Sequence, residues 1–195
     1  MDAFISSLKA HYPSKKIDKG YTWNTARIEG NVAKLIPVDA DDPTDIERAR
    51  KSFQNERKIY SMLPSWWGIR LVDSYEDGSI FVIMTNEYKN CKWRSFMTRD
   101  KKSIIADIQR QLDWLRSKKI LHNDLELKNI LLSCDGNHAV IIDFEKSKMN
   151  ASELEMKAER DRILQELQIE LKETRVRSRS VGAKRRKRIT RRKRI

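Results

Sequence analysis

The stretch that decides the fold reads His122-Asn-Asp-Leu-Glu-Leu-Lys-Asn-Ile-Leu-Leu132, followed closely by Ile141-Ile-Asp-Phe-Glu145. An Asp-Gly pair between the two apolar runs favours a tight turn, which predicts a short hairpin. Asn129 and Asp143 then lie on adjacent backbone segments. A carbonyl and a carboxylate oxygen in such a place are ligands that Mg²⁺ prefers, and they leave room for phosphate oxygens. The stretch therefore predicts a magnesium site beside a phosphate.

Two charged residues interrupt apolar patterns earlier in the chain. Strand alternation over 32–38 places Lys34 on the same face as Val32 and Ile36. In a predicted helix that follows, Glu56 fills a gap in the inward apolar stripe. A buried carboxylate is unfavourable unless it meets a cation, so the two side chains are candidates for an ion pair. Periodicity alone also allows a snorkelling surface lysine and a simple polar interruption.

The remaining pattern predicts a mixture of strands and helices. Helix starts are indicated by Asp42 followed by proline, and by Ser152 followed by Glu155 in a capping box. The predicted elements are two strands within 21–38 around Glu29-Gly30-Asn31, a hairpin over 69–84, and helices over 43–63, 102–117 and from 152 onward.

The two quoted motifs resemble the HRDLxxxN and DFG motifs of protein kinases. In that resemblance Asp124 matches the catalytic aspartate, Asn129 and Asp143 match the two magnesium ligands, and His122 is a structural support of the loop. Val32-Ala33-Lys34 resembles the VAIK strand, and Glu56 matches the glutamate of the C-helix. The positions for ATP binding are then Lys34, Glu56, Ala33, Met84 and Leu131.

This resemblance implies an α+β fold with two lobes, a small antiparallel-sheet N-lobe at about 15–88 and a reduced helical C-lobe at about 89–172. It also implies ATP and Mg²⁺ as cofactors. Lys34 would hold the α and β phosphates, Glu56 would hold Lys34, and Asp124 would orient the acceptor hydroxyl. The expected function is phosphoryl transfer to Ser or Thr hydroxyls of a protein acceptor.

Three departures separate the chain from typical protein kinases. The segment from Gly20 to Ala26 keeps one glycine where the family usually has three. Glu126 stands where a lysine usually contacts the transferred phosphate, and Glu145 replaces the glycine of DFG. After Glu145 the sequence predicts a single further helix, so we expect this chain to lack the activation segment and the peptide-binding helices.

Several related classes are compatible with these departures. With its short C-lobe, the chain resembles minimal or atypical kinases such as the RIO family and the small kinase of the KEOPS complex. The HND and IDFE sequences also resemble choline/ethanolamine and aminoglycoside kinases, which phosphorylate small molecules. A catalytically weak pseudokinase that acts as an interaction module is the third reading.

The net charge of +13 lies in one segment. Residues 175–195 contain 12 of the 41 Lys and Arg residues and no acid, so 29 basic residues face 28 acidic ones in the rest of the chain. A segment of this kind, about 173–195, is expected to be disordered. It is a candidate for nuclear import or nucleic-acid contact. The candidate residues are Lys184, Arg185, Arg186, Lys187, Arg188, Arg191, Arg192, Lys193 and Arg194.

The remaining composition bears on location. No run approaches the ~20 apolar residues of a bilayer span, and Met1-Asp2-Ala3-Phe4 lacks the pattern of a signal peptide. The expected location is therefore inside the cell, nuclear or cytoplasmic, without membrane association. Cys91 and Cys134 lie in no metal-binding spacing and are expected to be free thiols.

Overall fold

The structure is a computed structural model, and it describes residues 2–89, 101–134 and 138–170. The chain forms two compact units. Unit 1 contains residues 1–89 together with 122–124 and 142–148, and unit 2 contains 90–121, 125–141 and 149–195. The single predicted division near residue 88 therefore misses two short segments, which carry His122, Asp124 and Asp143 into unit 1.

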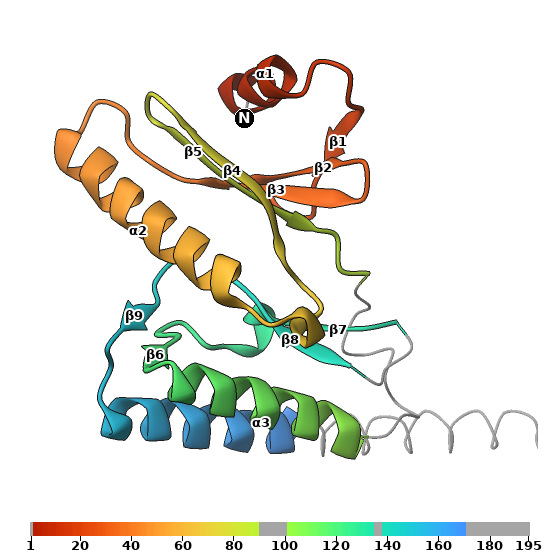
Figure 1. The fold of residues 1–195 in the computed structure, drawn as a ribbon, viewed down its shortest axis with the longest axis vertical. Coiled ribbons are helices and arrows are strands. Elements are labelled where there is room, and N and C mark those ends of the chain that lie inside the picture. The colour runs from red at the N-terminus through yellow and green to blue at the C-terminus, as the bar shows by residue number, and fades with distance from the viewer. Residues whose placement is uncertain (1, 90–100, 135–137, 171–195) are drawn as a thin grey trace, which may run out of the picture. The chain divides into compact units, whose positions relative to one another are not determined.

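Unit 1 is built on a five-stranded antiparallel sheet in the order β1-β2-β3-β5-β4. One face of the sheet carries α1 and the other carries α2 (Figure 1). The expectation of an α+β fold with a small antiparallel sheet is confirmed. The elements are α1 (Asp2–His11), β1 (Ile17–Lys19), β2 (Thr25–Ile28), β3 (Asn31–Ile36), α2 (Pro43–Met62), η1 (Ser65–Trp67), β4 (Leu71–Asp77) and β5 (Ile80–Asn86).

The sequence signals for α2 act as predicted. Asp42 caps the helix because its Oδ1 accepts a hydrogen bond from Thr44 N at 2.8 Å, and Pro43 occupies the first helical position. The helix ends before Leu63, whose backbone is extended. On the inward face, Phe53 and Glu56 are both buried.

Two tight turns set the register of the sheet. Glu29 and Gly30 both have positive φ, 46° and 80°, which is the backbone twist that a two-residue hairpin turn requires. The following hairpin turns at Gly78, where φ is 61°. Strands β3 and β5, which no hairpin turn joins, pair so that Lys34 lies opposite Ile83 and Ala33 opposite Met84.

The N-terminal helix α1 was not predicted from the sequence. Its Phe4 and Leu8 are buried in one cluster with Ala26, Ala33 and Met84 of the sheet. Further along α1, the ring of His11 stacks on Tyr75 with centroids 3.7 Å apart. The helix therefore supplies the core on the face of the sheet opposite α2.

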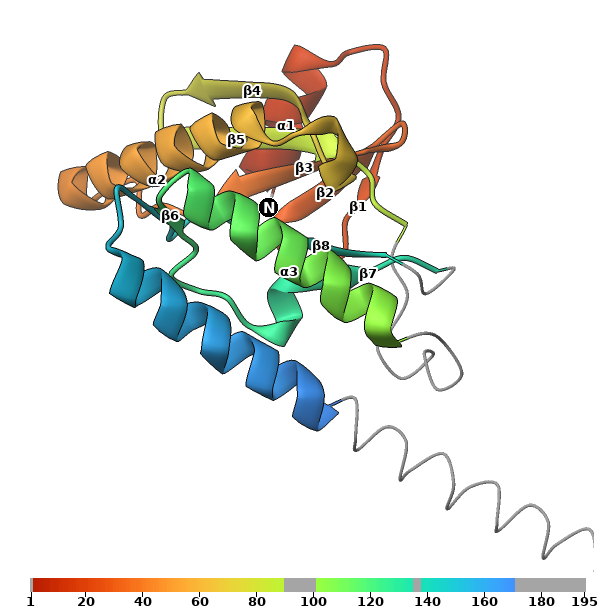
Figure 2. The same cartoon turned by 60° about the horizontal axis from the view of Figure 1, so that its bottom comes forward.

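Unit 2 contains α3 (Lys101–Ser117), β6 (Ile120–Leu121), η3 (Leu127–Asn129), β7 (Ile130–Leu132), β8 (Ala139–Ile141) and a helix over 153–170. The short strand β9 (Lys148–Met149) spans the boundary between the units. In Figure 2, α3 and the 153–170 helix run beside each other in opposite directions. Arg160 Nη1 donates to Asp113 Oδ1 at 2.6 Å, and Arg116 pairs with Glu153, so these ion pairs join the two helices.

The predicted hairpin of unit 2 is confirmed, since β7 and β8 pair antiparallel. It is attached to α3 through the buried side chain of Gln111, which donates to Ala139 O at 2.6 Å and accepts from Ile141 N at 2.8 Å. The capping box also forms, because Ser152 N donates to Glu155 Oε2 at 2.8 Å.

Two further expectations bear on the fold. Cys134 is disulfide-bonded, so the expectation of a free thiol is wrong at this position. The distance between two cysteines along the sequence does not decide whether their side chains meet in the folded chain. The other cysteine, Cys91, lies outside the described residues. Within the described ranges, no helix combines the length and apolar character needed to cross a bilayer.

Candidate functional site

A lysine surrounded by three carboxylates forms the centre of the site in unit 1. Lys34 Nζ lies 3.1 Å from Glu56 Oε2, 2.5 Å from Asp143 Oδ1 and 3.1 Å from Glu145 Oε2. The Lys34 side chain is 18% exposed and that of Glu56 is fully buried. The predicted ion pair between Lys34 and Glu56 is therefore present, and Asp143 and Glu145 extend it.

Burial and charge act against each other on these groups. Burial disfavours the ammonium, but Glu56, Asp143 and Glu145 outweigh it and hold the pKa of Lys34 well above its usual value. Burial raises the pKa of Glu56 to about 7, with Lys34 opposing and the neighbouring carboxylates assisting that rise. Burial also works against ionised Asp143, yet the ion pair with Lys34 prevails and its pKa is lowered.

Asp143 is held by a buried aromatic group. Its φ is 70°, a left-handed conformation that is uncommon outside glycine. The backbone N–H of Asp143 donates to the Tyr60 hydroxyl at 3.3 Å. The next residue, Phe144, is fully buried, and its ring centroid lies 5.4 Å from that of Tyr60, 5.1 Å from His122 and 6.1 Å from Trp67. Phe144 therefore fixes the turn that presents Asp143 to Lys34.

His122 joins the loop of Asp124 to the strand end before Asp143. Its Nε2 lies 2.9 Å from Ile142 O, and the ring is fully buried. Its backbone carbonyl accepts a hydrogen bond from Ser147 Oγ at 3.2 Å. Asp124, two residues later, is 3.2 Å from Lys146 Nζ. This geometry fits a supporting role for His122.

Residues 26–163, more than two thirds of the chain, match the family model described as the protein kinase domain. The chain belongs to the protein kinase domain family. Three relatives resemble this kinase domain at low identity. Ribosomal protein S6 kinase alpha-3 of Homo sapiens is 28% identical over 143 residues, 73% of the chain. Ribosomal protein S6 kinase 2 beta of Xenopus laevis is 29% identical over 137 residues, 70% of the chain.

The third relative is serine/threonine-protein kinase B of Synechocystis, which is 25% identical over 121 residues, 58% of the chain. The kinase domain covers only a small part of each relative, 17% of the alpha-3 protein, 19% of the Xenopus protein and 21% of the Synechocystis protein. These comparisons establish the family and not the acceptor.

Two of the predicted ATP-binding positions lie on the opposite face of the sheet from Lys34. Ala33 and Met84 pair across β3 and β5, and both are buried in the cluster that includes Phe4 and Leu8 of α1. Strand alternation explains this, because a residue next to Lys34 must point to the other face. Val32, two residues before Lys34, lies on the same face of the sheet as Lys34. Across the sheet it pairs with Thr85.

In unit 2, Asn129 is buried at the end of η3, and its backbone N–H donates to Glu126 O at 2.9 Å. Leu131 is half-buried in β7. Their predicted roles in magnesium and ATP binding remain predictions. The basic residues from Lys184 to Arg194 lie outside the described residues.

The glycine-poor segment forms an ordered turn. Gly20 N donates to Thr25 O at 3.1 Å, and a β-carbon at Gly20 would collide with Thr25, so glycine is required there. Thr22 N donates to Thr25 Oγ1 at 2.9 Å. Tyr21 and Trp23 are exposed, and the Tyr21 hydroxyl donates to Glu87, which follows β5. This turn is therefore tied by side chains where typical kinases have flexible glycines.

The donor set around Asp143 suits a hard cation. Ligand oxygens of Glu56, Asp143 and Glu145 lie within 4.8 Å of one another. Carboxylate oxygens are the ligands that Mg²⁺ prefers. In the structure these three carboxylates contact the Lys34 ammonium, and the magnesium role of Asp143 remains a prediction.

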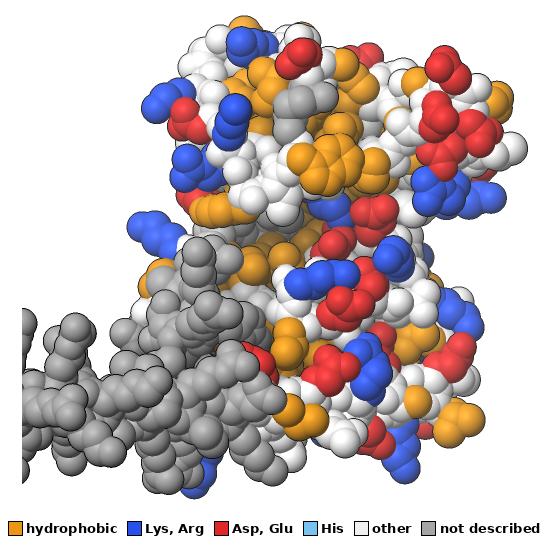
Figure 3. Space-filling model, turned by 180° about the vertical axis from the view of Figure 1, so that it is seen from behind, with side chains coloured by type: hydrophobic (Ala, Val, Ile, Leu, Met, Phe, Trp, Pro, Cys, Tyr) orange, Lys and Arg blue, Asp and Glu red, His pale blue; other side chains and the backbone are white. Residues whose placement is uncertain are grey.

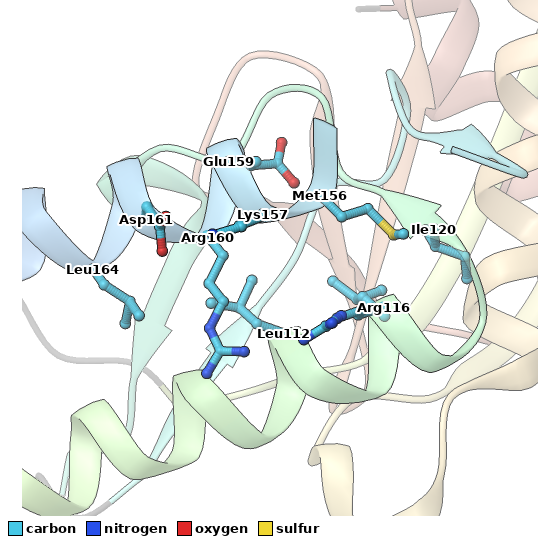
Figure 4. Close-up of a pocket in the computed structure, with 10 residues that line it drawn as sticks. Leu112, Arg116, Ile120, Met156, Lys157, Glu159, Arg160, Asp161 and Leu164 are labelled. Atoms are coloured by element: carbon cyan, nitrogen blue, oxygen red, sulfur yellow. The ribbon is translucent and has the colours of Figure 1, made fainter. Parts of the chain in front are cut away.

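Unit 2 has a separate cavity of about 510 Å³ between α3 and the 153–170 helix. Figure 4 shows an apolar wall that includes Met156 and Leu164, with Arg160 extending toward α3. None of its described lining residues is a predicted site residue. The lining consists of Leu112, Leu115, Arg116, Ile120, Met156, Lys157, Glu159, Arg160, Asp161 and Leu164.

Acidic and basic side chains alternate over the described surface seen in Figure 3. This mixture agrees with the near-balance of charge in residues 1–174 and gives no strongly basic patch on that view of the described residues.

Proposed function

We propose that this chain is an ATP- and magnesium-dependent phosphotransferase of the atypical protein kinase type, which acts on Ser and Thr hydroxyls. The observation that carries the proposal is the buried Lys34–Glu56 ion pair at 3.1 Å, with Asp143 on the same ammonium. Membership of the protein kinase domain family supports it. A protein acceptor is favoured because relatives at low identity are named as serine/threonine-protein and ribosomal protein kinases.

In the proposed reaction each residue has a distinct task. Lys34 binds the α and β phosphates while Glu56 orients its ammonium. Asp124 orients the acceptor hydroxyl and receives its proton as the oxygen bonds to the γ-phosphorus and the bond to ADP breaks. Asp143 and Asn129 would hold magnesium, which when bound neutralises phosphate charge. Phosphoryl transfer needs mainly this positioning and charge neutralisation.

A thermal-shift titration with Mg-ATP is the decisive first test. The wild type is expected to gain several degrees in melting temperature, because a ligand that binds only the folded state stabilises it. The Asp143→Ala variant is expected to lose the magnesium-dependent part of that gain. If neither protein shows a magnesium-dependent shift, the nucleotide site does not exist.

Two other readings differ in the acceptor. The IDFE sequence ending in Glu145 favours a small-molecule kinase. The two added negative charges of Glu126 and Glu145 favour a pseudokinase. Transfer of radiolabel from ATP to the protein itself, to a generic protein substrate, and to choline or an aminoglycoside separates the readings. Label on protein supports the proposal, label on the small alcohol supports the first alternative, and ATP binding without transfer supports the second.

We also propose that the basic segment 175–195 directs the protein to the nucleus or contacts nucleic acid. Its twelve basic residues without an acid support either role. Deleting 175–195 is expected to abolish salt-dependent binding to nucleic acid and nuclear accumulation of a fluorescent fusion. A deletion that changes neither would contradict the proposal.

A further inference from the structure

Lys146 is held beside Asp124 by the backbone of its own turn. Asn123 Nδ2 donates to Lys146 O at 3.2 Å, and Ser147 Oγ donates to His122 O at 3.2 Å. On the other side, Asn55 Nδ2 donates to Ser147 O at 2.6 Å. These bonds hold the carbonyl of Lys146 and the following residue, Ser147, so the lysine starts from a fixed position next to the loop of Asp124.

Asn123 makes this arrangement possible. Its φ is 64°, and asparagine is one of the few residues with a side chain that tolerates this conformation. From there its amide reaches the carbonyl of Lys146. The turn is closed by a hydrogen bond from Ser147 N to Phe144 O at 3.0 Å, directly after the buried Phe144. Two loops that are distant in sequence are therefore locked together around one lysine.

The ion pair of Lys146 and Asp124 is too exposed to serve mainly for stability. Lys146 Nζ lies 3.2 Å from Asp124 Oδ2, and the side chains are 62% and 19% exposed. A surface ion pair of this kind contributes little to stability. An exposed ammonium on a fixed backbone remains able to move to another anion nearby.

The charges around Asp124 suggest which anion the Lys146 ammonium would meet. In unit 1, four carboxylates, Asp124, Glu56, Asp143 and Glu145, face the two lysines of the ion pairs, Lys34 and Lys146. Lys34 contacts three of these carboxylates. The carboxylate two residues after Asp124, Glu126, pairs with Lys128 at 3.0 Å. A negatively charged phosphoryl group that approaches Asp124 would therefore find Lys146 as the nearby exposed cation.

We propose that Lys146 is a catalytic residue that binds the γ-phosphoryl group during transfer. This inference rests on the proposed function. As the acceptor oxygen bonds to phosphorus and the bond to ADP breaks, the acceptor proton passes to Asp124. The Lys146 ammonium then exchanges its contact with the Asp124 carboxylate for the γ-phosphoryl oxygens, where charge is concentrated.

The test compares four variants with the wild type. Lys146→Ala removes the cation, Lys146→Arg keeps it, and Lys148→Ala makes the same charge change at an exposed position two residues away. The double variant Glu126→Lys with Lys146→Ala restores a cation close to Asp124 in sequence. Because Lys146 is exposed, all variants are expected to fold, and circular dichroism with a melting curve checks this.

The first measurement is nucleotide affinity by calorimetry in the presence of Mg²⁺. Lys146→Ala is expected to weaken binding of a non-hydrolysable ATP analogue about tenfold and to leave ADP affinity unchanged, since a hydrogen bond to a charged group is lost only with the γ-phosphate. Lys148→Ala should match the wild type for both nucleotides. Equal loss for ADP and the ATP analogue would overturn the assignment.

The second measurement is steady-state transfer to the acceptor found for the wild type. Lys146→Ala is expected to lower kcat about 100-fold, the usual effect of removing one group that stabilises transition-state charge. Lys146→Arg should retain most of the activity, and the double variant should recover at least a tenth of it. A Lys146→Ala enzyme within twofold of the wild type in kcat would overturn the inference.

The outcomes also separate this inference from the proposed function. A wild type that binds no nucleotide contradicts both. A wild type that binds ATP and ADP, with an unchanged preference in Lys146→Ala, contradicts the role of Lys146 alone and leaves the nucleotide site intact.

Discussion

Lys34 Nζ lies 2.5 Å from Asp143 Oδ1, although 109 positions separate the two residues. With Glu56 and Glu145 the ammonium has three carboxylate neighbours, and a lysine has three N–H donors. Hydrogen bonds to Glu56 and Asp143, together with the ion pair with Glu145, therefore occupy the ammonium. A phosphate can bind to Lys34 only if at least one of the three contacts is released.

Glu145 is the carboxylate that we expect to be released. Glu145→Gln removes its charge, so Lys34 should accept a phosphate more easily and Mg-ATP affinity should rise about fivefold, the difference between a charged and a neutral hydrogen bond. Calorimetry with Mg-ATP measures this. Glu76→Gln, which removes a carboxylate paired with Arg50 on the surface, is the control and should have no effect. Weaker binding of Mg-ATP by Glu145→Gln would instead identify Glu145 as a cation ligand.

The raised pKa of Glu56 predicts a pH-dependent stability of the metal-free and nucleotide-free protein. In the folded state the pKa is about 7, against 4.5 for an ordinary glutamate. Between these values the unfolded chain loses the proton while the folded protein keeps it. Stability therefore decreases as pH rises from 4.5 to 7, by on the order of 3 kcal/mol in total, and is level above pH 7.

Glu56→Gln removes this dependence. The free energy of unfolding is measured with urea at pH 5, 6, 7 and 8 for both proteins. From pH 5 to pH 7 the wild type should lose stability relative to the variant. Lys34 and Asp143 do not obscure the window, because their pKa values shift upward from 10.5 and downward from 3.8. A difference that stays constant from pH 5 to 7 would show that Glu56 is ionised throughout that range.

The parts of the site that the sequence predicted rest on short-range signals. The caps of α2 and the periodicity of its inward stripe gave both the helix and Glu56, and strand alternation gave Lys34. The same alternation rule explains why Ala33, the neighbour of Lys34, lies on the opposite face of the sheet in the cluster with α1. The role of Ala33 in ATP binding came from the motif resemblance alone and remains a prediction.

Other features depend on contacts that no local pattern contains. The helix α1 is a short amphipathic segment whose burial is decided by the sheet that it covers. The pairing of Lys146 with Asp124 arises because Asn123 and Ser147 join two loops through bonds between residues 23 and 25 positions apart. A lysine three residues after Asp143 was a visible signal, but only the folded turn shows which carboxylate it meets.

The packing of α1 leads to a prediction about the sheet. Leu8 is fully buried against the cluster that contains Ala33 and Met84. Leu8→Ala should lower the free energy of unfolding by about 2–5 kcal/mol, as expected for a buried leucine. Lys9→Ala, at an exposed position on the same helix, should change it by less than about 0.5 kcal/mol. Urea denaturation measures both, and equal effects would show that α1 does not pack on the sheet in solution.

Phe144 offers the most direct test of how the turn of Asp143 is held. Its ring is fully buried and contacts Tyr60, His122 and Trp67. Phe144→Ala should reduce the free energy of unfolding by about 3–5 kcal/mol because a cavity remains where the ring was. Phe144→Leu fills most of that space and should cost about 1–1.5 kcal/mol.

The two variants should also differ in nucleotide binding. Since Phe144 fixes the turn of Asp143, Phe144→Ala is expected to weaken Mg-ATP binding even at a temperature where the variant is fully folded, and Phe144→Leu to weaken it less. Calorimetry at low temperature, with folding checked by circular dichroism, separates the binding effect from unfolding. If Phe144→Ala is destabilised but binds Mg-ATP like the wild type, the aromatic group supports the fold and does not position Asp143.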